Sequence, residues 1–129
     1  METDPKRIFD LLFGFYDQRL AALAKAGVAR DRIVLDPGMG YFLGADPEVS
    51  LTVLRNLPRL KERYNLPVMI SVSRKSFVRR LAGVAVADAG AATLAAELFA
   101  TLQGADILRS HDVKALTQAL AVWSALGTG

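Results

Sequence analysis

Three short segments of this 129-residue chain carry polar and charged residue types that can bind a ligand. They are residues 36–40 (Asp-Pro-Gly-Met-Gly), residues 73–76 (Ser-Arg-Lys-Ser) and residues 109–111 (Arg-Ser-His). The Asp36 carboxylate can accept a pair of hydrogen bonds from an amidine-like ring edge. The N–H groups of a helix that starts near Ser76 can bind a carboxylate or a phosphate. We therefore expect a ligand with a hydrogen-bonding ring edge and an anionic group.

Each polar segment follows an apolar run that is typical of a β-strand. The first run shows no alternation of polar and apolar residues, and the three runs lie at residues 33–36, 67–72 and 105–109. The first two runs predict strands buried on both faces, as in a parallel sheet, and the third predicts a weaker strand. Ligand sites of parallel α/β folds lie at the carboxyl edge of the sheet. We expect Asp36, Lys75 and Arg109 to end three neighbouring parallel strands and to face a common pocket.

Helical patterns flank and separate these strands. The first thirty residues predict one helix, because apolar residues recur at helical spacing at Ile8, Leu11, Leu12, Phe15, Leu20 and Leu23. A helix start is expected at Asp46-Pro47-Glu48. This helix should continue to about Tyr64, with a kink or break at Pro58.

Three further helices complete the pattern. They are expected at residues 77–81, at about residues 88–103, and after Asp112, where one face carries Val113, Leu116, Leu120 and Trp123. Helices and strands then alternate along the whole chain. This order predicts a single α/β domain over residues 1–129 with a parallel sheet.

Each candidate residue also has a purely structural interpretation. Asp36 before Pro-Gly can be a turn residue that accepts a hydrogen bond from its own backbone. Lys75 can be a solvated lysine, but two cations, Arg74 and Lys75, on the first turn of a helix oppose its dipole and favour a bound anion or carbonyl. A single histidine such as His111 is more often structural than catalytic. The Arg-x-His pair before a capped helix nevertheless favours a pyrophosphate clamp.

Composition excludes several classes of protein. Hydrophobic residues make up 52% of the chain and charged residues 22%, which is typical of a packed globular domain. There are no cysteines, which fits a reducing, cytoplasmic location. No apolar run approaches the roughly 20 residues of a membrane span, and no secretion signal follows the N-terminus. The 16 Lys and Arg residues are scattered among 13 acidic ones, so we expect neither a nucleic-acid nor a membrane partner.

Taken together, the three polar segments resemble the last three strands of the dihydropteroate synthases. Residues 36–40, 73–76 and 109–113 occur in the family's order and at similar spacing, and the resemblance extends from about Phe15 to Trp123. The loops are most similar to the branch that includes acquired sulfonamide-insensitive enzymes. The family joins dihydropterin pyrophosphate to p-aminobenzoate in folate biosynthesis, aided by Mg²⁺. The resemblance therefore implies a transferase with these two substrates.

The resemblance implies a role for each polar segment. Asp36 would bind the amino-pyrimidine edge of the pterin, and Lys75 its carbonyl and ring nitrogen. Arg109 and His111 would bind the pyrophosphate leaving group. In the implied reaction pyrophosphate departs from the pterin methylene, and the aniline nitrogen attacks the resulting cation.

The resemblance places p-aminobenzoate between the loop of residues 73–76 and the loop that follows Asp36. Ser76, at a helix N-terminus, would bind its carboxylate, and Arg74 would also contact substrate. Tyr41 and Phe42 are further expected contacts. Many family members carry Phe-Gly-Lys after the position of Gly40, so this side of the pocket is expected to be reshaped here.

The fold implied by the resemblance is a TIM-type βα barrel of eight strands and about 250 residues. This chain would supply its C-terminal part, three parallel strands with flanking helices, and would leave the barrel incomplete. The family's magnesium-binding Asn lies in the missing part, so no metal ligand is expected here. Three strands leave two unpaired edges beside apolar surface. We therefore expect a truncation that is inactive alone and that forms a homo-oligomer or associates with an N-terminal half.

Two rival functions remain open from the sequence. One is a related pterin-binding barrel, the methyltetrahydrofolate methyltransferases, in which the Ser-Arg-Lys-Ser and Arg-x-His segments are not expected at these places. The other is a non-catalytic α/β interaction or dimerisation module. Binding of p-aminobenzoate would separate the first rival, and substitution of Lys75 and Arg109 in a complete enzyme would separate the second.

Overall fold

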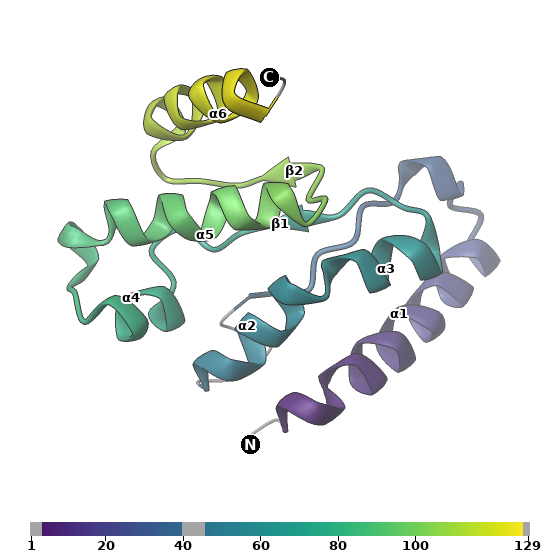
Figure 1. Cartoon of the computed structure of the whole chain (residues 1–129). Coiled ribbons are helices and arrows are strands. Elements are labelled where there is room, and N and C mark those ends of the chain that lie inside the picture. The colour runs from purple at the N-terminus through teal and green to yellow at the C-terminus, as the bar shows by residue number, and fades with distance from the viewer. Residues whose placement is uncertain (1–3, 40–45, 128–129) are drawn as a thin grey trace.

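The computed structural model describes residues 4–39 and 46–127. Helices and short parallel strands alternate along this part of the chain, which confirms the predicted α/β class (Figure 1). The helices are α1 (Ile8–Lys25), α2 (Pro47–Arg55), α3 (Leu57–Tyr64), α4 (Ser76–Ala82), α5 (Gly90–Leu102) and α6 (Val113–Gly127). The strands are β1 (Met69–Ile70) and β2 (Ile107–Leu108), and short 3-10 turns lie at Pro5–Arg7, Arg30–Arg32 and Val86–Asp88.

The helix boundaries follow the local signals in the sequence. Asp46 caps α2 by accepting a hydrogen bond from the backbone N–H of Glu48 at 3.0 Å. α2 ends at Arg55 and α3 begins at Leu57, so the helix breaks next to Pro58 as predicted. Gly83 ends α4 in the left-handed conformation, with φ of 69°.

The strands run parallel and lie side by side in chain order. The Leu35 N–H donates to the Pro67 carbonyl at 2.9 Å, and Leu35 forms a parallel bridge with Val68. On the other side β1 pairs with β2, with Met69 opposite Ile107. The parallel arrangement is confirmed, but the strands are shorter than predicted. The segment at residues 33–36 is reduced to the single bridge at Leu35.

The prediction that the first two strands are buried on both faces is wrong. Leu35 is buried and Val68 and Ile70 are fully buried, whereas Val34 keeps 44% of its surface exposed and Met69 is half-buried. Only one face of the strands packs against the core formed with the helices. Parallel sheets in complete domains are covered on both faces. The second face is therefore open in this chain.

Two amphipathic helices also differ from expectation. α1 buries Ile8, Phe9, Leu12 and Tyr16, whereas the predicted core residue Leu11 is 53% exposed. The predicted apolar face of α6 contributes only Leu116 to the buried residues, and Val113 is 64% and Trp123 39% exposed. α6 packs on α5 and stands apart from α1, α2 and α3 (Figure 1). Among the described residues, no helix is long and apolar enough to cross a membrane.

Tyr64 joins α3 to α1 through a buried hydroxyl. The hydroxyl donates to Asp17 Oδ1 at 2.7 Å, and Arg63 Nη2 donates to Asp17 Oδ2 at 2.7 Å. The hydrogen bond from Arg63, followed by that from Tyr64, lowers the pKa of the Asp17 carboxyl. Tyr16 is equally buried, but its hydroxyl has no partner among the described residues.

This pair of tyrosines offers a matched test of the packing. We expect Tyr64→Phe to lower the free energy of unfolding by about 1–2 kcal/mol, because it removes a hydrogen bond to a charged acceptor. Tyr16→Phe removes only an unpartnered hydroxyl and should be neutral or stabilising. Urea unfolding at neutral pH measures both changes. Equal losses in the two variants would contradict the assignment.

Candidate functional site

The three polar segments lie at the same edge of the parallel strands. Asp36 follows the Leu35 bridge, and Arg109 follows β2 and donates its backbone N–H to the Ile70 carbonyl at 3.0 Å. The shared carboxyl edge is therefore confirmed. Asp36 lines two hollows beside α1, whereas Arg74 lines a separate cavity. The common pocket for Asp36, Lys75 and Arg109 stays a prediction.

Asp36 is exposed and organises the first loop. Its Oδ1 accepts a hydrogen bond from the Gly38 backbone N–H at 2.9 Å, which is the turn geometry expected of an Asp before Pro-Gly. Asp36 and Tyr16 line a hollow of about 110 Å³. Burial, and then the nearby Asp36 charge, raise the pKa of the Tyr16 hydroxyl well above its ordinary value. The sequence did not identify Tyr16 as part of this hollow. Its position four residues after Leu12, on the same face of the helix, was the signal that could have revealed it.

The loop after β1 holds Arg74 in a left-handed backbone conformation with φ of 57°. A non-glycine residue in this region carries about 1–3 kcal/mol of strain and keeps this conformation only where its surroundings hold it, and such residues cluster at functional sites. The Thr93 hydroxyl accepts a hydrogen bond from the Arg74 N–H at 3.1 Å, and Arg79 Nε donates to the Arg74 carbonyl at 3.2 Å. Both peptide groups around Arg74 are therefore anchored.

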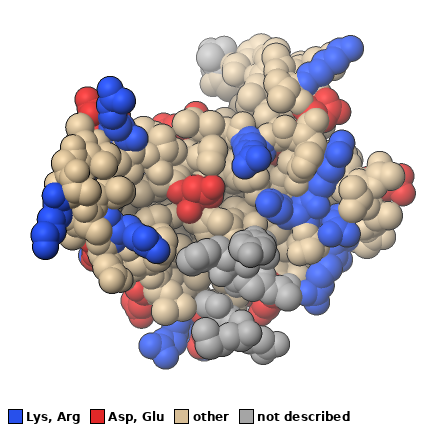
Figure 2. All heavy atoms as spheres, turned by 180° about the vertical axis from the view of Figure 1, so that it is seen from behind, with Lys and Arg blue, Asp and Glu red and all other residues tan. Residues whose placement is uncertain are grey.

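Lys75 and Ser76 lie where this loop becomes α4. Lys75 occupies the N-cap position and Ser76 is the first helical residue, but no side chain caps the helix. The Lys75 ammonium makes neither a hydrogen bond nor an ion pair with the described part of the chain. α4 itself carries Arg79 and Arg80 in its last turn, and Figure 2 shows Lys and Arg side chains on both sides of the face it presents. This region can therefore receive an anion or a carbonyl oxygen.

Ser73 connects the second and third polar segments. It is 3% exposed, and its hydroxyl lies 2.8 Å from His111 Nδ1 and accepts the His111 backbone N–H at 3.1 Å. Arg109 and His111 themselves are exposed. The structure therefore brings residues 73–76 and 109–111 together, as the sequence predicted, and gives His111 a fixed position.

The inner wall of these two loops comes from α5, which sequence analysis treated only as an alanine-rich helix. Thr93 and Glu97 are buried one turn apart on its face toward the loops. Together with Ser73 and Ser110 they line a cavity of about 170 Å³. Two polar residues four positions apart in an alanine-rich helix were the signal that could have revealed them.

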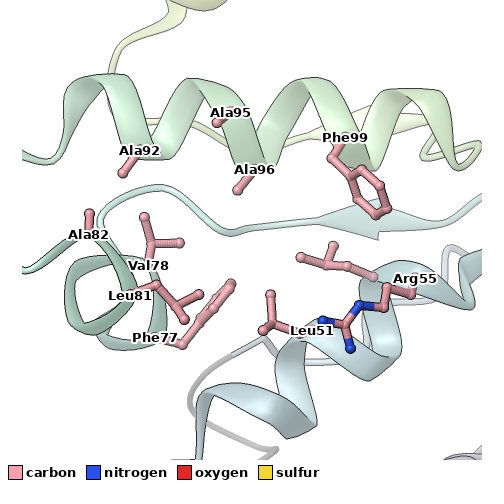
Figure 3. Close-up of a pocket in the computed structure, with 11 residues that line it drawn as sticks. Leu51, Arg55, Phe77, Val78, Leu81, Ala82, Ala92, Ala95, Ala96 and Phe99 are labelled. Atoms are coloured by element: carbon pink, nitrogen blue, oxygen red, sulfur yellow. The ribbon is translucent and has the colours of Figure 1, made fainter.

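A larger groove lies away from this polar cavity. It measures about 410 Å³ and runs between α2, α4 and α5 (Figure 3). Its walls are mainly apolar side chains, including Leu51, Phe77, Ala96 and Phe99, with Arg55 at one end (Figure 3). Apart from Arg55, the groove is lined only by apolar side chains, so it lacks the set of polar residues that the predicted chemistry needs.

Two predicted elements of the site are not represented in this geometry. Tyr41 and Phe42 lie outside the described residues. Within residues 4–39 and 46–127, no group of three or more His, Cys, Asp or Glu side chains is placed to hold a metal ion. A magnesium ion bound with substrate would take most of its ligands from pyrophosphate oxygens and water.

Comparison with protein families and curated sequences gives a consistent result. Residues 2–111 match the family described as "Pterin binding enzyme". The chain is 52% identical over 127 residues to the type-3 dihydropteroate synthase of Escherichia coli, a match that covers 98% of this chain and 48% of that protein. It is 56% identical over 119 residues to the type-2 enzyme of Escherichia coli, covering 92% and 44%. The chain therefore spans about half the length of these relatives.

Solved structures show the same partial match. The dihydropteroate synthase of Xanthomonas albilineans in complex with 7,8-dihydropteroate superposes with a TM-score of 0.87 at 33% identity, covering 95% of this chain and 46% of that one. The enzyme of Coxiella burnetii in complex with pteroic acid gives a TM-score of 0.87 at 28% identity, covering 96% and 45%. The fold of this chain is therefore part of the barrel that those proteins share.

Proposed function

Because this chain belongs to the family of pterin-binding enzymes, we propose that it forms the last three strand-and-loop units of a dihydropteroate synthase. The reaction is the condensation of a dihydropterin pyrophosphate with p-aminobenzoate in folate biosynthesis. The observation that carries the proposal is the set of three polar loops at one carboxyl edge of parallel strands, with Ser73 joining two of them. Neither an interaction module nor a scaffold requires this arrangement.

The polar loops divide the chemistry between them. Asp36 binds the amino-pyrimidine edge of the pterin through the carboxylate oxygen that Gly38 leaves free. Lys75 holds the pterin carbonyl and ring nitrogen, and Ser76 and Arg74 bind the p-aminobenzoate carboxylate, with Tyr41 and Phe42 beside it. All of these contacts position the reacting methylene carbon and the aniline nitrogen.

Arg109 and His111 act on the leaving group. The bond between the pterin methylene carbon and the pyrophosphate oxygen breaks, and the electron pair leaves with pyrophosphate. The lone pair of the aniline nitrogen then forms the new C–N bond, and that nitrogen gives up a proton to solvent. Fixed positive charge at the departing oxygens is the kind of stabilisation that often dominates such catalysis. Magnesium enters the proposal only as an ion held by pyrophosphate and by residues outside this chain.

Activity in this proposal requires the remaining part of the barrel. Val34 beside the first bridge is 44% exposed and Ile107 on β2 is 43% exposed, so apolar surface adjoins both outer edges of the strands. Unpaired strand edges beside apolar surface favour association. We propose that these edges are covered by an N-terminal half of the barrel or, failing that, by a second copy of this chain.

The test compares the chain alone with a chimera. In the chimera this chain replaces the matching 127 residues of the Escherichia coli type-3 enzyme, to which it is 52% identical. We expect synthase turnover from the chimera and none from the isolated chain, measured as dihydropteroate formed from both substrates. Turnover by the isolated chain would refute the need for the other half. A folded chimera that binds pterin but ignores p-aminobenzoate would favour the methyltransferase alternative.

A further inference from the structure

The buried polar face of α5 meets the two loops that the proposed function assigns to substrate. Thr93 is 6% exposed, and its hydroxyl holds the loop of residues 73–76 by accepting the Arg74 N–H. Glu97, one turn further along, is 1% exposed and lines the cavity that is also lined by Ser110, from the loop of residues 109–111. α5 therefore offers one polar anchor to each loop.

Glu97 is an unusual occupant of this cavity. Its two carboxylate oxygens are buried and make no hydrogen bond of standard geometry with the described residues. Burial raises the pKa of the Glu97 carboxyl most strongly, the Ser110 hydroxyl lowers it, and the Asp112 charge raises it, with a net increase. Ser110 lines the same cavity as Glu97, and its hydroxyl oxygen accepts the Asp112 backbone N–H at 3.3 Å, so its own O–H can still donate to the Glu97 carboxylate. Arg74 is the cationic residue that lines the same cavity.

The backbone after β2 explains why Ser110 matters. Arg109 and His111 are exposed, whereas Ser110 between them is half-buried and contributes to the cavity wall. Alternate residues of an extended segment point to opposite sides. A contact that fixes Ser110 toward α5 therefore also fixes the side to which Arg109 and His111 point.

We propose that Glu97 is a positioning residue, which anchors the Ser110 hydroxyl and so presents Arg109 and His111 to a pyrophosphate group. The inference rests on the proposed function, because it concerns the two residues, Arg109 and His111, that the proposed function assigns to pyrophosphate. It also explains why a carboxylate occupies a place where it costs stability. A buried group with a raised pKa disfavours folding once the pH exceeds its ordinary pKa, and an apolar side chain would remove this cost.

The experiment uses the 129-residue chain with inorganic pyrophosphate as the probe and calorimetry as the readout. We expect Glu97→Leu and Ser110→Ala each to weaken pyrophosphate binding by about three- to tenfold, as for loss of one hydrogen bond. The double variant should bind no more weakly than the weaker single variant, because both changes remove one contact. Ser110→Thr keeps the hydroxyl and should retain affinity.

Two controls separate positioning from general loosening of the fold. Urea unfolding should show Glu97→Leu to be at least as stable as the parent chain at pH 7, so that lost affinity does not reflect unfolding. If that variant does not fold, Glu97→Met, which keeps an unbranched side chain but has no carboxylate, replaces it in the same cycle with Ser110→Ala. Thr101→Val alters a neighbouring turn of α5, where the Thr101 hydroxyl donates to the Glu97 carbonyl, and should leave affinity unchanged.

The outcomes distinguish a failure of the Glu97 positioning role from a failure of the proposed function. Arg109→Ala should abolish pyrophosphate binding. If Arg109→Ala leaves the affinity unchanged, or the parent chain does not bind, the proposed role of Arg109 fails and the inference fails with it. If Arg109→Ala abolishes binding while Glu97→Leu and Ser110→Ala have no effect, or if their effects simply add, only the positioning role of Glu97 is overturned.

Discussion

Replacing Lys75 with alanine is expected to lower the synthase rate of the chimera by about a hundredfold or more, the loss seen when one preorganised electrostatic contact to a reacting group is removed. Lys75 occupies the N-cap position of α4 at the carboxyl edge of β1, and its ammonium is unpaired among the described residues. A pterin carbonyl and ring nitrogen would supply the missing partners. The initial rate of dihydropteroate formation at saturating p-aminobenzoate measures the effect.

A second lysine provides the control for this experiment. Lys25 lies in the last turn of α1, is exposed and does not line the hollows that contain Asp36 or Arg74. Lys25→Ala makes the same change in net charge and should leave the rate within about twofold. Retention of full activity by the Lys75 variant would remove Lys75 from the mechanism and strengthen the scaffold interpretation of this fold.

Replacing Ile70 with alanine is expected to cost about 3–5 kcal/mol of the free energy of unfolding. Ile70 lies in β1, the middle strand, and is fully buried in the core that the helices share. Truncation of such a side chain loses its transfer free energy and leaves a cavity. Because small domains have only about 5–15 kcal/mol of stability in total, this variant should be largely unfolded at moderate urea concentrations.

The neighbouring strand β2 contains an exposed isoleucine that serves as the control for Ile70. Ile107 lies on β2, opposite Met69, and keeps 43% of its surface exposed. Ile107→Ala should cost less than about 1 kcal/mol in the isolated chain. In the chimera its cost should rise if the missing barrel half covers β2. Equal costs for the two substitutions in the isolated chain would show that the core does not lie on the side of Ile70.

Local signals determined most of the secondary structure. Asp46 with Pro47, Pro58 and Gly83 each set a helix boundary where the sequence predicted one, because capping, ring geometry and a left-handed φ act within a few residues. The parallel arrangement of the strands was also predictable from the alternation of helices and apolar runs. The same reasoning located the polar loops, because polar residues that follow buried strands must emerge at one edge.

Burial could not be predicted with the same success. Val34, Leu11 and Trp123 are apolar residues that the sequence placed on buried strands or on the apolar faces of helices, yet each remains substantially exposed. Whether an apolar side chain is covered depends on which element packs over it, and this chain spans less than half of the relatives that supply the complete barrel. A hydrophobic pattern specifies a face, but not its partner.

The residue types at positions 36, 75 and 109, their order and their place after parallel strands were fixed by the amino-acid sequence alone. The contact of Ser73 with His111, the anchoring of Arg74 by Thr93 and the burial of Glu97 beside Ser110 arise only in the folded chain. The two hydrogen-bonded pairs join residues 38 and 19 positions apart, and Glu97 and Ser110 line one cavity. No local pattern encodes such pairs, because the packing of α5 against the loops brings them together.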